Sequence, residues 1–553
     1  MSPERFLEQF GYLADAPNGI VKLRELILQL AVRGKLVPQD QRSSPVDPLK
    51  IPRRFTLGAS NIDLEAVPFS LPEGWTWAPL LALGDWANGC GFPKSIQGHT
   101  DKPHLFCKVS DMNLEGNDKF IRNTNNTIDD GLAAKWKIKL HPAGTIIFPK
   151  IGGAISTNKR RVLTRPTAID NNCLGITPGT DCSTDWLFLL LRSLDLAKYQ
   201  SGTSVPALSQ GVIGRIVTGL PPLAEQSRIV AKVDQLMALC DELETKQTQR
   251  ADTHIHLIRA AHHSLTQPCD HNEFQSAWQR IRDNFDQLHT TLDSVKTLRQ
   301  TILQLAVRGK LVPQDPNDEP ASVLLEKIRA EKERLVAEGK IKKKKSLPRI
   351  EPGDVPLELP RGWEWVRVGS VLNVTSGMTF DKGLEKVDGV IPYVKVGNMS
   401  MPGNELVITT SSRFIDPDGR MEDWIIPAGS IIFPKRGGAI ATNKKRIVKD
   451  PIFVDLNTMA LTPTKGGVDT AYVYQWLSSV DLATLNTGTS VPQINHKDIE
   501  PLPFPLPPRA EQHRIVAKVD QLIALCDDLE AKINANESAS RHFAEAVVAE
   551  LAA

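Results

Sequence analysis

The chain carries the same series of motifs twice, and this duplication constrains its fold more than any other feature. The segment ILQLAVRGKLVPQD at Ile27–Asp40 recurs unchanged at Ile302–Asp315. Four further motifs recur in the same order: LPEGWTW as LPRGWEW, IIFPKIGGAISTNKRR as IIFPKRGGAIATNKKR, SGTSVP as TGTSVP, and RIVAKVDQLMALCDELE as RIVAKVDQLIALCDDLE. Long-period self-similarity indicates a duplicated structural unit, and 553 residues are too many for a single core.

Each copy reads as a helix, a linker, a globular domain and a second helix. Short β-type runs such as GTIIFP and IPYVKV, separated by Gly, Asn and Pro turns, fill the globular parts. The predicted fold class is α/β: two mixed α/β domains in tandem repeat, joined by long antiparallel coiled-coil-like helices. The predicted boundaries are 1–40 for an N-terminal helical segment, 41–70 for a linker, 71–220 for the first domain, 221–315 for a central helical spacer, 316–358 for a linker with a basic run, 359–506 for the second domain and 507–553 for a C-terminal helical spacer.

The repeated helices carry apolar residues at alternating steps of four and three, which is the spacing of a coiled-coil seam. The predicted seam residues are Ile229, Val233, Leu236, Cys240 and Leu243 in the first copy, and Ile515, Val519, Leu522, Cys526 and Leu529 in the second. No proline occurs between Ala224 and Leu265, so the first helix could extend ~60 Å. An ordinary core helix with one apolar face is the alternative, but four such segments in matched pairs favour a paired-helix connector.

Signatures of catalysis and metal binding are missing from the sequence. There is no phosphate loop, dinucleotide fingerprint, nucleophile elbow or methyltransferase tetrapeptide, and we therefore predict no catalytic residues. The seven cysteines form no C-x-x-C pair and the histidines lack ligand spacing, so no metal site is predicted. The sequence shows neither a secretory signal nor a membrane span, which predicts a cytoplasmic protein without membrane contact.

The repeated basic loop has the composition of a phosphate-binding segment, with hydroxyl, amide and cationic side chains close together. With a net charge of only +2, any nucleic-acid surface must come from such local clusters. The predicted DNA-binding residues are Lys150, Ser156, Thr157, Asn158, Lys159, Arg160 and Arg161 in the first copy, and Lys435, Arg436, Thr442, Asn443, Lys444, Lys445 and Arg446 in the second. The Gly-Thr-Ser-Val-Pro loops add Thr203, Ser204, Thr489, Ser490 and Gln493. Solvated or purely structural turns are the alternative.

Two segments at equivalent places in the copies share little sequence, namely Asn88–Asp101 and Thr375–Asp388. If the two domains share one backbone but carry different side chains in these segments, we expect them to recognise different targets. The base-reading residues suggested there are Lys94, Gln97 and His99 in the first copy, and Thr379, Asp381 and Lys382 in the second. The run Lys340–Lys345 is interpreted as a solvated linker end that could also add salt-sensitive attraction to DNA.

The whole order of motifs resembles the specificity subunits of type I restriction–modification systems. The resemblance rests on the motifs LPEGWTW, GTIIFPK with its Gly-Gly, GTSVPALS and PPLAEQSRIVAKVDQL, each of which has a second copy. The resemblance implies a non-catalytic host-defence subunit whose two target-recognition domains read a split site in double-stranded DNA. It also implies that the helices separate the domains and dock two methyltransferase subunits, and that motor-nuclease subunits join for restriction. S-adenosylmethionine, ATP and Mg would then belong to those partners, and this chain would bind no cofactor.

Two other classes of function stay open at this point. A fused methyltransferase–nuclease is disfavoured by the missing catalytic motifs. A scaffold whose duplicated domains bind protein would show no affinity for duplex DNA, whereas a DNA-binding subunit should bind duplexes in a salt-dependent way.

Overall fold

The computed structural model describes residues 10–39, 69–202, 205–267, 271–339, 347–355, 358–419, 421–485 and 491–552. The chain forms two compact units, the first comprising Met1–Ala251 with Asn536–Ala553 and the second comprising Asp252–Ala535. The division falls inside two long helices, α6 (Leu223–Thr266) and α14 (Arg509–Ala552), rather than in a loop. Each unit contains one globular domain and parts of both long helices, and each is described separately.

The globular domain of the first unit is built on three small sheets. Its strands are β1 (Thr76–Pro79), β2 (Gly84–Asn88), β3 (His104–Cys107), β4 (Phe120–Ile121), β5 (Thr127–Ile128), β6 (Ile146–Pro149), β7 (Arg161–Leu163), β8 (Thr167–Ile169), β9 (Cys173–Pro178) and β10 (Val217–Leu220). The five-stranded sheet has the order β2-β9-β6-β7-β4, the three-stranded sheet β5-β3-β8, and β1 pairs with β10. All pairs are antiparallel except β4 with β7 and β3 with β8.

The second unit repeats this topology strand for strand. Its strands are β11 (Glu364–Arg367), β12 (Leu372–Ser376), β13 (Ile391–Val394), β14 (Val407–Ile408), β15 (Phe414–Ile415), β16 (Ile431–Pro434), β17 (Arg446–Val448), β18 (Phe453–Val454), β19 (Thr458–Pro463) and β20 (Pro503–Leu506). The sheet orders are β12-β19-β16-β17-β14, β15-β13-β18 and β11-β20, which match the first domain position by position. The predicted pair of mixed α/β domains in tandem is therefore confirmed.

The repeated Ile-Ile-Phe-Pro motif forms the central strand of each large sheet. All four residues of β6 and of β16 are buried, so the run is apolar on both faces as expected for a covered strand. Helices α4 (Thr184–Ser193) and α12 (Thr470–Ser479) pack against these strands. Their first turns are capped by the side chains of Ser183 and Asp469, which accept hydrogen bonds from free backbone amides. The smaller helices of the domains are α3 (Asp130–Trp136), α5 (Gln210–Ile213), α11 (Val368–Val371) and α13 (His496–Ile499).

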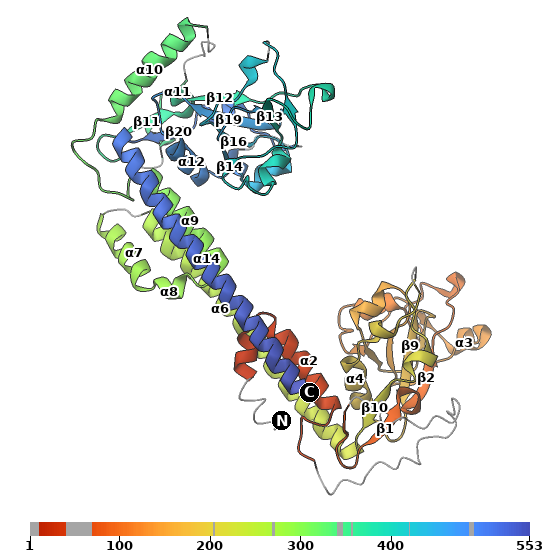
Figure 1. Ribbon diagram of the computed structural model, residues 1–553. Coiled ribbons are helices and arrows are strands. Elements are labelled where there is room, and N and C mark those ends of the chain that lie inside the picture. The colour runs from red at the N-terminus through yellow and green to blue at the C-terminus, as the bar shows by residue number, and fades with distance from the viewer. Residues whose placement is uncertain are drawn as a thin grey trace. The chain divides into compact units, whose positions relative to one another are not determined.

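In the first unit, three helical segments pack lengthwise around one apolar core (Figure 1). They are α2 (Gly19–Val32), the N-terminal part of α6 and the C-terminal end of α14. The predicted seam residues Ile229, Val233, Leu236 and Cys240 are buried and Leu243 is partly buried, in the same cluster as Ala544 and Val547 of α14. Arg24 of α2 forms ion pairs of 2.6 and 2.7 Å with Asp241 and Glu244 at the edge of this core.

The second unit has the same arrangement of packed helices, in which α9 (Leu292–Val307) takes the place of α2. The seam residues Ile515, Val519 and Cys526 of α14 are buried against α9, with Leu522 and Leu529 partly buried. The ion pairs recur between Arg299 and Asp527 at 2.5 Å and between Arg299 and Glu530 at 3.0 Å. Because α6 contributes its start and α14 its end to the first unit, the two helices run antiparallel, as predicted.

Three helices of the second unit have no described counterpart in the first. α7 (His271–Asp283) and α8 (Phe285–Leu288) pack on the end of α6 and on α9. α10 (Ala321–Ala337) packs on the globular domain through Ala321, Leu324, Leu325 and Ile328. The basic run Lys340–Lys345 that follows lies outside the described residues.

A cluster of Trp, Glu and Gln joins three repeated motifs in each unit, and its Trp and Glu side chains are buried. Trp75 Nε1 donates to Glu225 Oε1 at 2.9 Å, and Gln39 Nε2 donates to the same oxygen at 3.0 Å. The second unit repeats these bonds from Trp363 at 2.9 Å and from Gln314 at 3.1 Å, both to Glu511. Burial raises the pKa of Glu511, while the hydrogen bonds from Gln314 and Trp363 oppose the rise. The LPxGWxW motif, the GKLVPQD motif and the first turn of a long helix thus meet at one carboxylate.

The glycine of GKLVPQD must adopt a left-handed conformation beside this cluster. Gly309 has φ of +65°, and a Cβ there would lie 2.4 Å from Pro360 Cγ. Gly466, also in the second unit, has φ of +72°, but a Cβ at this residue would meet no neighbouring atom within 4 Å. The two residues therefore share backbone strain but differ in steric room.

We predict that Gly309→Ala destabilises the protein more than Gly466→Ala. Left-handed strain should cost either variant ~1–2 kcal/mol, and the clash with Pro360 should add ~1–3 kcal/mol in Gly309→Ala alone. Urea unfolding of the full chain, followed by tryptophan fluorescence, measures both losses. Equal losses would show that the contact between Gly309 and Pro360 carries no cost.

Candidate nucleic-acid interface

The structure brings the two repeated loops of each domain side by side. In the first domain, Gly152 N donates to Pro206 O at 2.7 Å and Leu208 N donates to Lys150 O at 2.8 Å. In the second, Gly437 N donates to Pro492 O and Ile494 N to Lys435 O, both at 2.8 Å, and Gln493 forms a β-bridge with Arg436. The Pro-Lys-x-Gly-Gly loop and the end of the Gly-Thr-Ser-Val-Pro loop thus form one surface. The predicted residues Thr203, Ser204, Thr489 and Ser490 lie outside the described residues.

The two glycines of the Pro-Lys-x-Gly-Gly loop have different structural roles. Gly152 and Gly437 have φ of 76° and 75°, a conformation that side chains rarely adopt. The next glycines, Gly153 and Gly438, are exposed and have open space where a Cβ would stand. No neighbour among the described residues excludes a side chain at these two positions, so their bare backbone is accessible to a ligand that approaches closely.

Two of the predicted phosphate-binding cations are buried, which contradicts the role assigned to them from the sequence. Arg160 is 3% exposed and Lys445 is 4% exposed. Arg160 donates to Asn158 Oδ1 at 2.6 Å and to Leu191 O at the end of α4 at 3.2 Å, and its guanidinium lies over the Phe148 ring. Lys445 Nζ donates to Asn443 Oδ1 at 2.7 Å and to Val480 O at the end of α12 at 2.9 Å. Both cations therefore hold the basic loop against the C-terminal end of a helix, where carbonyl groups favour positive charge.

Arg161 and Arg446 also have structural partners. Arg161 Nη2 donates to Met112 O at 2.9 Å, and Arg446 Nη2 donates to Met399 O at the same distance. Burial lowers the pKa of each guanidinium. These arginines tie the basic loop to the segment after β3 or β13, so their part in binding a ligand would be secondary.

The accessible side chains of the basic loop carry hydroxyl, amide, ammonium or guanidinium groups. Ser156, Thr157 and Asn158 are exposed, and Lys159 is partly exposed, its ammonium donating to Asn113 Oδ1. In the second domain, Thr442 and Arg436 are exposed, and Asn443, Lys444 and Lys435 are partly exposed, with Lys444 donating to Ser400 Oγ. Lys150 is partly exposed at the exit of β6. These residues, with Gly153 and Gly438, make up the surface that we term the shared loop surface.

The residues suggested for base reading lie on the loops after β2 and β12. Lys94, His99, Thr379, Asp381 and Lys382 are exposed. Gln97 differs, because both ends of its amide are engaged: Nε2 donates to Phe92 O at 2.8 Å and Oε1 accepts from Lys108 Nζ at 3.0 Å. None of these placements tests the suggestion that the residues read bases.

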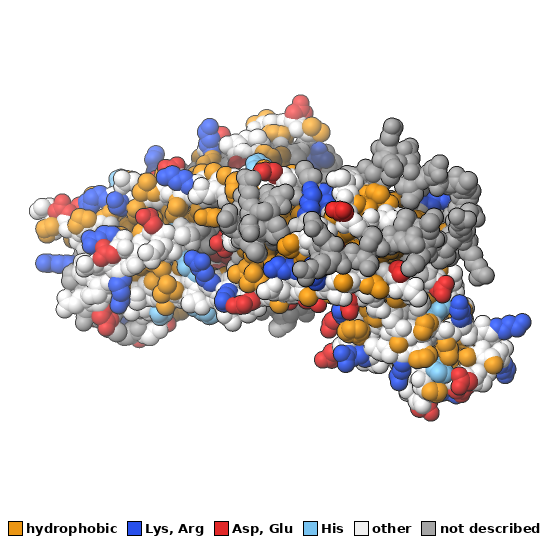
Figure 2. All heavy atoms as spheres, turned by 90° about the horizontal axis from the view of Figure 1, so that it is seen from below, with side chains coloured by type: hydrophobic (Ala, Val, Ile, Leu, Met, Phe, Trp, Pro, Cys, Tyr) orange, Lys and Arg blue, Asp and Glu red, His pale blue; other side chains and the backbone are white. Residues whose placement is uncertain are grey.

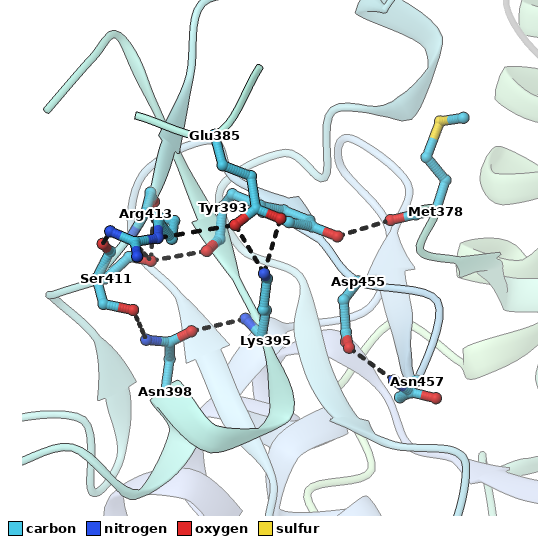
Figure 3. Close-up of polar contacts among 10 residues, drawn as sticks. Met378, Glu385, Tyr393, Lys395, Asn398, Ser411, Arg413, Asp455 and Asn457 are labelled. Carbon is cyan, nitrogen blue, oxygen red and sulfur yellow. Dashed lines mark hydrogen bonds and ion pairs between the residues drawn. The ribbon is translucent and has the colours of Figure 1, made fainter. Parts of the chain in front are cut away.

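The second domain replaces the Gln97–Lys108 contact by an ion pair (Figure 3). Lys395, which corresponds to Lys108, donates to both oxygens of Glu385 at 2.8 Å, and Arg413 lies 3.8 Å from the same carboxylate. Each lysine also lies over an aromatic ring, Phe92 or Tyr393. The two domains therefore share a lysine anchor but differ in the charge of its partner.

The structure places two further polar pairs beside the shared loop surface, and the sequence analysis did not predict them. Asn88 Nδ2, at the end of β2, donates to Gln210 Oε1 at 3.2 Å. At the equivalent place, Ser376 Oγ lies 3.0 Å from His496 Nε2 and accepts a hydrogen bond from Lys435 Nζ at 2.9 Å. The members of each pair are more than a hundred residues apart in the chain, so only their equivalent positions in the repeat could have pointed to them.

On the face drawn in Figure 2, Lys and Arg side chains lie singly or in small groups among acidic and apolar ones.

Within the described ranges, no helix has the length and apolar character needed to cross a bilayer. In the same part of the chain, no group of three or more His, Cys, Asp or Glu side chains is placed to hold a metal ion.

Comparison with known proteins identifies the class to which this duplicated fold belongs. The family model described as "Type I restriction modification DNA specificity domain" matches residues 102–252 and 360–536, one stretch in each repeat. The type I restriction enzyme EcoAI specificity subunit of Escherichia coli is 32% identical, with 96% of this chain and 93% of that protein covered. The EcoEI specificity subunit of the same species is 28% identical, with the same shares covered.

A solved structure from a study of "complex assembly" and "conformational transition of the type I R-M system" shares the fold. It has a TM-score of 0.50 and 18% identity, covering 88% of this chain and 99% of the other. The match of a family model to both repeats defines a protein with two DNA-recognition domains. The chain belongs to the specificity subunits of type I restriction–modification systems.

The buried lysine gives a prediction for stability as a function of pH. Burial lowers the pKa of Lys445 from 10.5 to about 8, with Asp481 opposing the shift. Between these values the unfolded chain binds the proton and the folded chain does not, so the free energy of unfolding should rise with pH across this window. Chemical denaturation of the wild type and of Lys445→Met from about pH 7.5 to about pH 10.5 measures the difference in slope.

Lys444→Met provides the matched control for this measurement, because its side chain is partly exposed at the adjacent position. The control should keep the wild-type slope, whereas Lys445→Met should lose part of it. Identical slopes in the wild type and Lys445→Met would show that folding does not lower the pKa of Lys445.

Proposed function

We propose that the shared loop surface of each domain holds the phosphate backbone of duplex DNA, and that the two domains read the two halves of a bipartite target. The observation that carries this proposal is the juxtaposition of the two repeated loops in both domains, joined by equivalent hydrogen bonds. Accessible hydroxyl groups, bare glycine backbone and lysine side chains are the groups that hold phosphate oxygens. Two domains with the same backbone and different neighbouring side chains suit a common grip with separate sequence preferences.

We further propose that this chain contributes recognition and leaves catalysis to its partners. The relatives are named specificity subunits of restriction enzymes, which supports a recognition role. In this proposal adenine methylation with S-adenosylmethionine belongs to methyltransferase subunits. ATP- and Mg-dependent translocation and cleavage are assigned to motor-nuclease subunits. In this scheme the chain itself binds no cofactor.

The long helices offer equivalent surfaces on which two methyltransferase subunits could dock. Leu239 of α6 and Leu525 of α14 occupy matching positions in the repeated RIVAKVDQL segment and its continuation, and their side chains are 37% and 58% exposed. Each points away from the buried seam formed by its neighbours Cys240 and Cys526. An exposed apolar residue shared by two copies of a helix supports a role in contact with the same kind of partner.

We predict that Lys159→Ala and Lys444→Ala weaken binding to duplexes of every sequence to the same extent. Phosphate contacts carry no base information, so affinity should fall without a change in preferred sequence. The slope of log affinity against log salt should flatten by about 0.9 for each phosphate that the variant no longer neutralises. Filter binding or fluorescence anisotropy with specific and random duplexes at several salt concentrations measures both quantities.

Lys246→Ala is the control for the lysine variants, since Lys246 lies on the exposed side of α6 in an ion pair with Glu242. It should leave both affinity and salt slope unchanged. An altered sequence preference at undiminished affinity in Lys159→Ala would mean that this loop reads bases instead. A wild-type chain without any duplex affinity would overturn the proposed function as a whole.

For the docking surface, we predict that Leu239→Glu and Leu525→Glu each remove one methyltransferase subunit from the assembly. A charged side chain at the centre of an apolar contact should block association, because the carboxylate would lose its hydration there. Light scattering of the chain mixed with its cognate methyltransferase would give the stoichiometry. Full stoichiometry in both variants would place the docking surface elsewhere, and Leu257→Glu, at an exposed position outside the matched pair, serves as the control.

A further inference from the structure

The two domains differ at one pair of positions next to the shared loop surface. In the first domain the pair is Asn88–Gln210, and in the second it is Ser376–His496. We propose that these pairs read base edges in the major groove: Asn88–Gln210 recognises an adenine, and Ser376–His496 recognises a guanine together with Lys435 and Arg436, the two members of the shared loop surface that we assign to bases instead of phosphate. This inference rests on the proposed DNA-binding function and assigns specificity residues to it.

The position of each pair is fixed by backbone that the two domains share. Asn88 and Ser376 are the last residues of β2 and β12, which pair with β9 and β19 in the same register. The glycines that follow, Gly89 and Gly377, pass so close to Asp170 O and Asp455 O that a Cβ would lie 1.7 and 2.2 Å away. The strand exit therefore cannot shift, and the side chain before each glycine is presented at a defined place.

The second member of each pair is positioned by the shared loop surface itself. Gln210 and His496 begin the short helices α5 and α13. These helices come shortly after Leu208 and Ile494, whose amides donate to the carbonyls of Lys150 and Lys435. The pair thus lies beside the lysine at the exit of β6 or β16, where a duplex held by the shared loops would present its bases.

The Asn88–Gln210 pair leaves one donor group and one acceptor unused. Asn88 Nδ2 donates to Gln210 Oε1, and the backbone carbonyl of Asn88 is held by His141 Nε2 at 3.2 Å. Within the described residues, no hydrogen bond engages Asn88 Oδ1 or Gln210 Nε2. An amide oxygen beside an amide N–H complements the N6 donor and N7 acceptor of adenine.

The second pair is part of a hydrogen-bonded chain that ends in a carboxylate. Lys435 Nζ donates to Ser376 Oγ, the serine hydroxyl is directed to His496 Nε2, and His496 Nδ1 donates to Glu500 Oε1 at 3.2 Å. This histidine tautomer is assigned from the partners. The chain orients the Lys435 ammonium, which keeps further N–H groups for a ligand.

The neighbouring residue strengthens the cationic character of the second site. Arg436 is exposed where the first domain has Ile151. Cationic donors beside one another complement the O6 and N7 acceptors of guanine. The same frame thus presents a mixed donor and acceptor edge in one domain and a donor-rich edge in the other.

Reciprocal exchange of the pairs tests this inference. The double variants are Asn88→Ser with Gln210→His, and Ser376→Asn with His496→Gln, each in the full chain. Selection of bound duplexes from a library of random sequence gives the preferred bases of the wild type and of both variants. We expect each exchange to change the preference at one position in one half-site, with a ~10- to 100-fold loss of discrimination there, and no change at other positions.

The exchange Glu385→Gln is the matched control, because this residue also differs between the domains but is engaged with Lys395. It should leave the selected sequence unchanged. The single variants Asn88→Ala and Ser376→Ala provide a second route that does not depend on introducing new side chains. They should flatten the preference at the same position while binding to random duplexes persists and thermal unfolding stays cooperative.

The possible outcomes separate this inference from the proposed function. If the wild type selects a bipartite sequence and the folded pair variants select the same one, the pairs do not read bases and the inference is overturned. Uniform loss of binding to all duplexes by a folded pair variant would also overturn it, since that result indicates backbone contact. If the wild type binds no duplex, the proposed function itself fails.

Discussion

The buried carboxylate of Glu225, and its counterpart Glu511, is the point on which each unit is assembled. It accepts hydrogen bonds from the indole of Trp75 or Trp363 and from the amide of Gln39 or Gln314. These three groups belong to the start of the globular domain, the loop after the short helix and the first turn of the long helix. A buried carboxylate without such partners would be strongly destabilising. The other contacts between the globular domain and the helices are therefore built around a fixed junction at this residue.

The sequence predicted the fold well because the features that determine it are periodic or repeated. The duplication implied two domains of one topology, the apolar steps of the long helices predicted their buried seam, and β-type runs such as GTIIFP predicted strands in the globular domains. Local composition was a poorer guide to the role of Arg160 and Lys445. Whether a cation faces solvent depends on distant partners such as Leu191 and Val480, whose positions no local pattern reveals. The pairing of Asn88 with Gln210 was hidden for the same reason.

Comparison of the two domains separates what holds the frame from what varies on it. At the buried position of the basic loop, arginine in one copy and lysine in the other both reach the end of a helix, although arginine makes more hydrogen bonds there. At the end of β2 and β12, by contrast, the exchange of asparagine for serine changes which groups are offered to a ligand. The buried difference between Arg160 and Lys445 is thus compensated within the fold. The difference between Asn88 and Ser376 lies at the surface and changes the groups that a ligand could contact.

The last helix of the chain completes the first unit. Ala544 and Val547, near the end of α14, share an apolar core with Ile229, Val233 and Leu236 of α6 and with residues of α2. During synthesis, the ribosome delivers α2 about five hundred residues, and the start of α6 about three hundred residues, before these partners emerge. The apolar groove of the nascent first unit therefore stays uncovered until α14 has been synthesised. Maturation of the first unit is consequently coupled to synthesis of α14, and a chain that stops before α14 would keep that apolar groove exposed to chaperones.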